Sequence, residues 1–144
     1  MYKHILIATD GSELAVKAVT TGLALAKTLG AKVTAVNATE PWTAMVTGEA
    51  ALAFPIEEYE KSSAENAAKI LAEVSAAAKT QGVACETLHV NDFPAEAIVG
   101  TAKAKGCDLI VMSSHGRRGL ARVLLGSQAT RVLTLSAVPV LICR

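Results

Sequence analysis

Short runs of apolar, often β-branched residues alternate with longer amphipathic segments along this chain. Such runs are typical of buried strands, which we expect at residues 4–9, 33–38, 83–90, 108–112 and 138–143. The intervening segments carry apolar residues at helical spacing, which predicts helices over residues 13–29, 57–81, 94–105 and 127–136. Strict alternation of strands and helices favours a parallel sheet with right-handed crossovers.

The fold class that follows is a doubly wound α/β domain of the Rossmann-like type. It has a five-stranded parallel sheet with helices on both faces, and we expect residues 1–144 to form a single domain. In such sheets ligands bind outside the carboxyl ends of the strands, where the strand order reverses. The segments to inspect are therefore residues 8–10, residues 38–40 and the loop after Met112.

Local signals fix some of the helix boundaries. Ser12 is a suitable N-cap for the first helix, Asp92 for the third, and Ser127 for the last. Residues 39–56 lack clear periodicity and are longer than most connections, which indicates a functional loop. Trp42 and Met45 in this loop could cover a bound base, pack on a second copy of the chain, or form a patch without function.

Composition excludes several classes of protein. Hydrophobic residues make up 51% of 144 and aromatic residues only 3%, so the core must consist of small and branched aliphatic side chains. The net charge of +1 is too balanced for a whole-surface nucleic-acid binder, and no apolar run approaches a membrane span. The chain enters a strand at once, so we expect no signal peptide and a cytoplasmic location. Cys85, Cys107 and Cys143 form no CxxC pair, so we expect buried, reduced thiols.

The segment from Ser113 to Ser127 is the best candidate for chemistry. A buried strand leads into a glycine-punctuated loop, and Gly126-Ser127 begins a helix, where backbone amides and the helix dipole favour phosphate. Every arginine of the chain lies from Arg117 onward, and Arg117, Arg118 and Arg122 lie within this loop. These features predict a nucleotide or phosphate site. The alternative is a loop whose glycines only make turns and whose arginines are solvated. Neither a Walker A loop nor a GxGxxG motif is present.

The whole chain resembles the universal stress protein family. Residues 5–12, Ile-Leu-Ile-Ala-Thr-Asp-Gly-Ser, are similar to that family's first strand and turn, and residues 126–142 to its last helix and strand. The ATP-binding branch carries the motif G-x2-G-x9-G-[ST], which corresponds here to Ser113-x2-Gly116-x9-Gly126-Ser127. The spacing is intact, and Ser113 replaces the first glycine. The resemblance implies a sheet of order 3-2-1-4-5 and ATP or ADP, with Mg²⁺, as the ligand.

It also implies which residues bind the nucleotide. Asp10 resembles an acidic residue near the nucleotide, where it could order a metal or contact the ribose, although Asp-Gly-Ser is also a common turn sequence. His115 is expected to shape the loop rather than to catalyse, while His4 and His89 have no metal-like spacing. The implied nucleotide-binding residues are Ala8, Thr9, Asp10, Ala38, Met112, Ser113, His115, Gly116, Arg117, Gly126 and Ser127.

The last strand, Val138 to Cys143, predicts a partner. An exposed apolar edge strand invites pairing with another chain, and antiparallel pairing of two copies gives a two-fold homodimer. The resemblance implies the same dimer; the alternative is a strand shielded by the neighbouring helix.

The predicted function is a cytoplasmic, nucleotide-dependent stress or signalling module that acts on a protein partner the sequence does not identify. Two rival hypotheses remain. One is a slow ATPase, which could use Asp10 and His115 but has no lysine in the phosphate loop. The other is a nucleotide-free member that acts through protein contacts. Nucleic acid is not expected as a ligand, because stacking aromatic residues are scarce.

Overall fold

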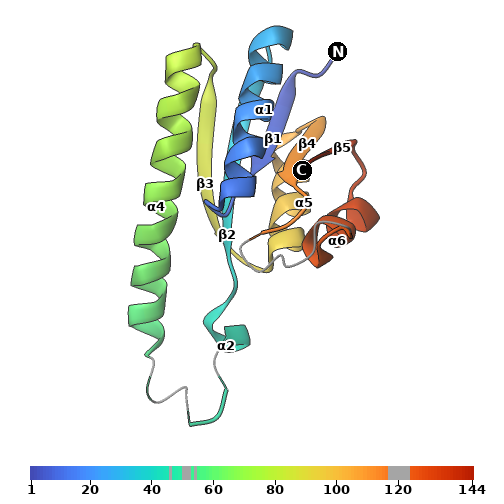
Figure 1. The fold of residues 1–144 in the computed structure, drawn as a ribbon. Coiled ribbons are helices and arrows are strands. Elements are labelled where there is room, and N and C mark those ends of the chain that lie inside the picture. Colours follow the sequence, from blue (N-terminus) through green and yellow to red (C-terminus); the bar gives the residue numbers. More distant parts are fainter. Residues whose placement is uncertain (46, 50–52, 54, 117–123) are drawn as a thin grey trace.

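A parallel sheet forms the centre of the molecule (Figure 1). The computed structural model describes residues 1–45, 47–49, 53, 55–116 and 124–144. Within these residues the sheet has five strands in the order β3-β2-β1-β4-β5, and every neighbouring pair is parallel. This confirms the predicted fold class and strand order. The strands are β1 (His4–Ala8), β2 (Lys32–Thr39), β3 (Cys85–Asn91), β4 (Leu109–Ser113) and β5 (Val140–Cys143).

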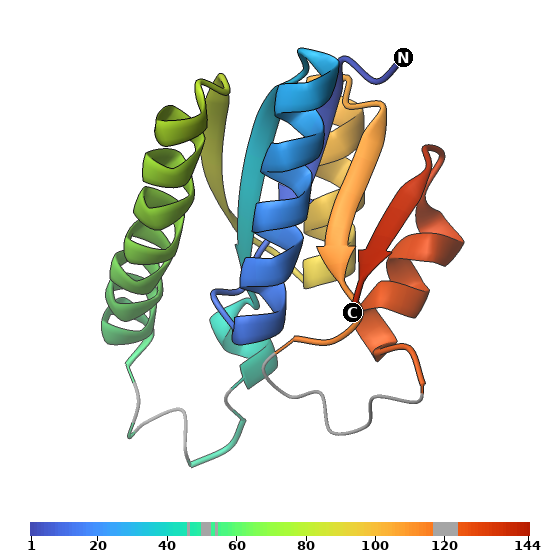
Figure 2. The same cartoon turned by 45° about the horizontal axis from the view of Figure 1, so that its top comes forward.

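Helices cover both faces of the sheet, as predicted (Figure 2). Helices α1 and α4 pack on one face, and helices α5 and α6 on the other. A short helix, α2, follows β2 within the segment that we expected to be irregular. The described helices are α1 (Glu13–Leu29), α2 (Trp42–Met45), α4 (Ile56–Gln81), α5 (Pro94–Lys105) and α6 (Ser127–Leu135). None of them combines the length and the apolar character that a membrane-spanning helix requires.

Strand β1 explains why the core divides into two layers. All five of its side chains are buried, and successive side chains point to opposite faces. Ile5 and Ile7 pack against α1 and α4, whereas Leu6 and Ala8 pack toward α5 and α6. Helix α1 lies so close to the sheet that a Cβ at Gly22 would come within 2.6 Å of Ile7 Cδ1. The small residues of the composition therefore serve close packing of helices on the sheet.

The helix caps agree only in part with the sequence signals. Ser12 does cap α1, with its Oγ 3.2 Å from the amide of Ala15. The prediction for α5 was wrong by one residue: Phe93 occupies the N-cap position, because Asp92 Oδ1 instead accepts the amide of Phe93 at 2.8 Å. In α6, Gly126 takes the N-cap position and Ser127 becomes the first helical residue.

The two edge strands differ in exposure. β3 is half-buried and alternating, as predicted for an edge. β5 is two residues shorter than expected and begins after Pro139, whose carbonyl accepts the amide of Ile110 at 3.0 Å. Leu141 in this strand is exposed.

The prediction about the cysteines holds in part. All three are free thiols, but only Cys107 is buried, and Cys85 and Cys143 are half-buried. Burial raises the pKa of the Cys107 thiol to about 11, so this sulfur stays protonated and unreactive near neutral pH.

Candidate functional site

A cavity of about 660 Å³ opens at the carboxyl ends of β1, β2 and β4. It lies where the strand order reverses between β1 and β4, the position at which doubly wound folds bind ligands. Each predicted site residue that the structure describes lines this cavity: Ala8, Thr9, Asp10, Ala38, Met112, Ser113, His115, Gly116, Gly126 and Ser127. Arg117, together with Arg118 and Arg122, lies outside the described residues.

Hydrogen bonds hold the end of β1 in a defined shape. The buried amide of Asn37 donates to the carbonyl of Thr9 at 3.0 Å, which ties β1 to β2. Asp10 Oδ1 accepts the amide of Ser12 at 2.9 Å, so the carboxylate stabilises the turn. A Cβ at Gly116 would lie 2.6 Å from the other oxygen, Asp10 Oδ2. Asp10 therefore shapes the turn, as its Asp-Gly-Ser sequence predicts, and its carboxylate also lines the cavity opposite Gly116; its role toward a metal or the ribose stays a prediction.

The loop after β4 is closed at its base. The amide of Gly126 donates to the carbonyl of Ser114 at 2.8 Å, and the amide of Ser114 donates to the carbonyl of Cys143 at 2.8 Å. A Cβ at Gly126 would lie 2.6 Å from the same Ser114 oxygen, closer than non-bonded atoms normally come. Gly126 therefore serves close backbone approach, and its φ of −62° needs no glycine. Ser114 connects the loop to both α6 and β5.

The cavity has an apolar part and a polar part. Ala8, Val36, Ala38, Ile98 and Met112 provide apolar wall from both sheet and helix. At the other side α6 begins, and the first amides of a helix have no acceptor within the helix and carry partial positive charge. Such a cavity suits a ligand with a flat apolar part and an anionic part.

The comparison with known proteins decides the family. Residues 1–144 match the model of the universal stress protein family. The chain belongs to the universal stress protein family. A relative, universal stress protein YxiE of Bacillus subtilis (strain 168), is 32% identical over 148 residues, with full coverage of both chains.

Solved structures of universal stress proteins share the fold. UspA from Lactobacillus plantarum superposes with a TM-score of 0.87 at 24% identity and covers 99% of this chain and 98% of its own. A universal stress protein crystallised in complex with cAMP has a TM-score of 0.70 at 26% identity, over 99% of this chain and 97% of its own.

Ser113 is the position at which this universal stress protein departs from the motif of the ATP-binding branch. The residue is 8% exposed, and its Oγ donates to the carbonyl of His115 at 2.8 Å. The hydroxyl is thus engaged in the turn that begins the loop. His115 takes part in the same turn, with Nδ1 3.1 Å from Ser114 Oγ, in agreement with the loop-shaping role predicted for it.

Some residues that line the cavity were not among those predicted from the sequence. Gln128 lines the cavity because it follows Ser127 in the first turn of α6, and helical phase could have indicated it. Tyr59 also lines the cavity, and its hydroxyl donates to the carbonyl of Glu40 at 2.6 Å. It comes from α4, and no local pattern links that helix to the strand ends. Met45 of α2, for which the sequence left open a role as a cover for a bound base, also lines the cavity.

Proposed function

We propose that this universal stress protein binds ATP or ADP with Mg²⁺ in the cavity and acts as a nucleotide-dependent stress-response or signalling module. The observation that carries the proposal is the single cavity that joins the ends of β1, β2 and β4 to the glycine loop and the beginning of α6. A volume of about 660 Å³ lies within the range of small-molecule sites. The cAMP complex of a related universal stress protein supports an adenine nucleotide as the ligand class.

The residues of the cavity fit the parts of a nucleotide. In the proposal the base lies against Ala38 and Met112, and the phosphates lie at Gly116, Gly126 and Ser127, where small residues and helix amides accommodate an anion. Asp10 holds Mg²⁺ or the ribose, because carboxylate oxygen is a ligand type that Mg²⁺ prefers. The ion, when bound, neutralises phosphate charge. The nucleotide-binding role that the resemblance implies for Arg117 stays a prediction.

The proposed signal passes through Ser114. This residue bonds to α6 through its carbonyl and to Cys143 of β5 through its amide. A nucleotide that binds beside Ser114 in the cavity would therefore change the support of the edge strand. We further propose that β5 pairs antiparallel with β5 of a second copy, which covers the exposed Leu141 and gives a homodimer. A cytoplasmic location and a protein partner that reads the nucleotide state complete the proposal.

Analysis of the purified protein tests the nucleotide site. The protein is prepared without added nucleotide and denatured, and the supernatant is examined by reverse-phase chromatography with mass detection. Adenine nucleotide near one molecule per chain, or micromolar ATP binding in calorimetry with Mg²⁺, is the expected result. Asp10→Asn should remove the Mg²⁺ dependence of that affinity. An empty protein that also fails to bind added ATP would refute the proposal and favour the nucleotide-free alternative.

The oligomeric state of the protein in solution tests the proposed homodimer. Sedimentation should give twice the mass of the chain, and Leu141→Lys should shift the protein toward monomer, because two charges would meet in the paired edge. A wild-type monomer at high micromolar concentration would refute the dimer.

A further inference from the structure

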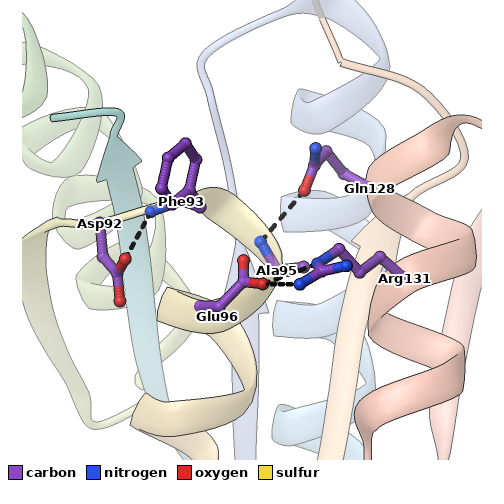
Figure 3. A network of polar contacts seen from close by, with 6 residues as sticks. All are labelled: Asp92, Phe93, Ala95, Glu96, Gln128 and Arg131. Carbon is purple, nitrogen blue, oxygen red and sulfur yellow. Dashed lines mark hydrogen bonds and ion pairs between the residues drawn. The ribbon is translucent and has the colours of Figure 1, made fainter. Parts of the chain in front are cut away.

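Helix α6 caps helix α5 from outside. Phe93, at the N-cap position of α5, has no side-chain acceptor for the first amides of that helix. Instead Gln128 of α6 accepts the amide of Ala95 through Oε1 at 3.2 Å (Figure 3). The first turn of α5 is thereby fixed to the first turn of α6.

A second contact between the same helices lies one turn further along α6. Arg131 Nε donates to Glu96 Oε1 at 2.6 Å, and the Nη2 of the same guanidinium reaches the same oxygen (Figure 3). These hydrogen bonds from Arg131 lower the pKa of the Glu96 carboxyl, and the backbone amide of Glu96 itself makes a smaller contribution in the same direction. The carboxyl is therefore ionised near neutral pH. The other oxygen, Glu96 Oε2, is buried and has no hydrogen-bond partner among the described residues. We call Gln128–Ala95 and Arg131–Glu96 together the α5–α6 tie.

Besides this tie, the hydrogen bond from the Gly126 amide to the Ser114 carbonyl holds the beginning of α6, but the packing of the helix itself is limited. It is nine residues long, and only Ala129 and Val132 among them are buried. Two small apolar side chains give limited packing against the sheet and α5. Gln128 and Arg131 are three residues apart and therefore lie on one face of the helix. Directional polar contacts on that face set the angle of the helix more sharply than this packing can.

The orientation of α6 matters because its beginning is the phosphate end of the proposed site. Gly126, Ser127, Gln128 and Ala129 all line the cavity, whereas neither Glu96 nor Arg131 is among its lining residues. We propose that Gln128, Glu96 and Arg131 are positioning residues, which hold the first amides of α6 at the angle that binds the phosphates of the ligand. This inference rests on the proposed function, and it concerns the phosphates and not the base.

The charges of the tie give a sharp test. If Glu96 and Arg131 acted only through their charges, Glu96→Gln would tighten the binding of an anion and Arg131→Gln would weaken it. Positioning predicts that both changes weaken ATP binding, because each removes one of the two charges that strengthen the Arg131–Glu96 hydrogen bonds. Gln128→Ala should act in the same direction. The expected loss is about three- to tenfold in Kd for ATP, the size found for coupled residues outside a binding site.

Adenosine separates positioning from a general structural role, because it has the base and ribose but no phosphate. Kd for ATP with Mg²⁺ is measured by calorimetry, and Kd for adenosine by NMR titration, which reaches millimolar values. Glu96→Gln and Arg131→Gln, which lie outside the cavity wall, should change adenosine binding by less than about twofold. Thr134→Ala, which removes an exposed side chain on the same helix, is the matched control and should leave both constants unchanged. Arg131→Lys keeps the charge and a donor and should recover part of the loss.

These measurements distinguish failure of the proposed nucleotide binding from failure of the positioning role. If the wild-type protein does not bind ATP, the proposed function fails, and this proposal fails with it. If the wild type binds ATP, three results overturn the positioning role alone: unchanged ATP affinity in the variants, opposite effects of Glu96→Gln and Arg131→Gln, or equal losses for ATP and adenosine.

Discussion

Replacement of Gly126 by alanine tests whether the absence of a side chain at this position is what allows the backbone to approach Ser114 closely. The new Cβ would lie 2.6 Å from the carbonyl oxygen of Ser114, and 3.4 Å from both the Cα and the Cδ2 of His115. The nearest atom belongs to the backbone, so it cannot rotate away as the end of a side chain can. The same carbonyl accepts the amide of Gly126 at 2.8 Å. The loop base must therefore widen, and this hydrogen bond must lengthen or break.

The expected loss of stability is moderate. Overpacking of a close contact costs about 1–3 kcal/mol. Alanine lowers the conformational entropy of the unfolded chain relative to glycine, which stabilises the folded state by about 0.4–1 kcal/mol. The free energy of unfolding should therefore fall by about 1–2 kcal/mol. ATP affinity should fall by more than about tenfold, because the loop base and the beginning of α6 move together.

Gly100→Ala is the matched control, since it adds the same methyl group within α5 at a position with no atom within 4 Å. There the helix propensity of alanine should raise stability by about 1 kcal/mol. Urea unfolding gives both stabilities, and calorimetry with ATP and Mg²⁺ gives the affinity. A Gly126→Ala protein that is as stable as wild type and binds ATP as tightly would show that close approach to the Ser114 carbonyl does not require glycine at this position.

Three further predictions concern single positions. Burial lowers the pKa of His4, so as the pH falls the unfolded state binds a proton before the folded state does. The free energy of unfolding should therefore decrease as the pH drops below the ordinary pKa of 6.5. Urea midpoints measured between pH 7.5 and about 5 should vary less with pH for His4→Gln than for the wild type. Gly116→Ala should lower stability slightly, because the Asp10 carboxylate must move away from the new Cβ 2.6 Å from its Oδ2, which disturbs its hydrogen bond with the Ser12 amide. Calorimetry should also show weaker Mg²⁺–ATP binding, and unchanged binding would argue against a role of Asp10. Gly22→Ala should lower stability by about 1 kcal/mol, since a clash with the fully buried Ile7 outweighs the gain in helix propensity, and a thermal scan that shows stabilisation would contradict this.

The order of elements could be predicted because its signals are local. The apolar run at β1 is short and its side chains are buried on both faces, which is why the run reads as continuous rather than alternating. Gly30, Gly82 and Gly106 end their helices in the left-handed conformation that glycine adopts most easily. Boundaries were less accurate where two residues compete for one role, as with Asp92 and Phe93 at the start of α5.

The candidate site could be predicted to the extent that it follows the ends of strands. Thr9 and Met112 lie where their strands end, and the topology brings those ends together. Tyr59 could not be found in this way, because its place in the wall depends on how α4 packs beside the sheet. The fixed orientation of α6 was also beyond sequence, because Gln128 and Ala95 are 33 residues apart and meet only across two packed helices.

Local sequence signals were enough to predict the alternation of strands and helices, the edge of the sheet at which the cavity opens, and the spacing of Ser113, Gly116 and Gly126. These follow from periodicity, turn chemistry and chain order, which act over a few residues. Three contacts became visible only in the folded chain: Ser113 Oγ bonds to the His115 carbonyl, Gly126 approaches the Ser114 carbonyl, and Gln128 of α6 accepts the Ala95 amide of α5. The physical reason is that hydrogen bonds and steric contacts are set at ångström range between segments whose separation in sequence carries no distance information.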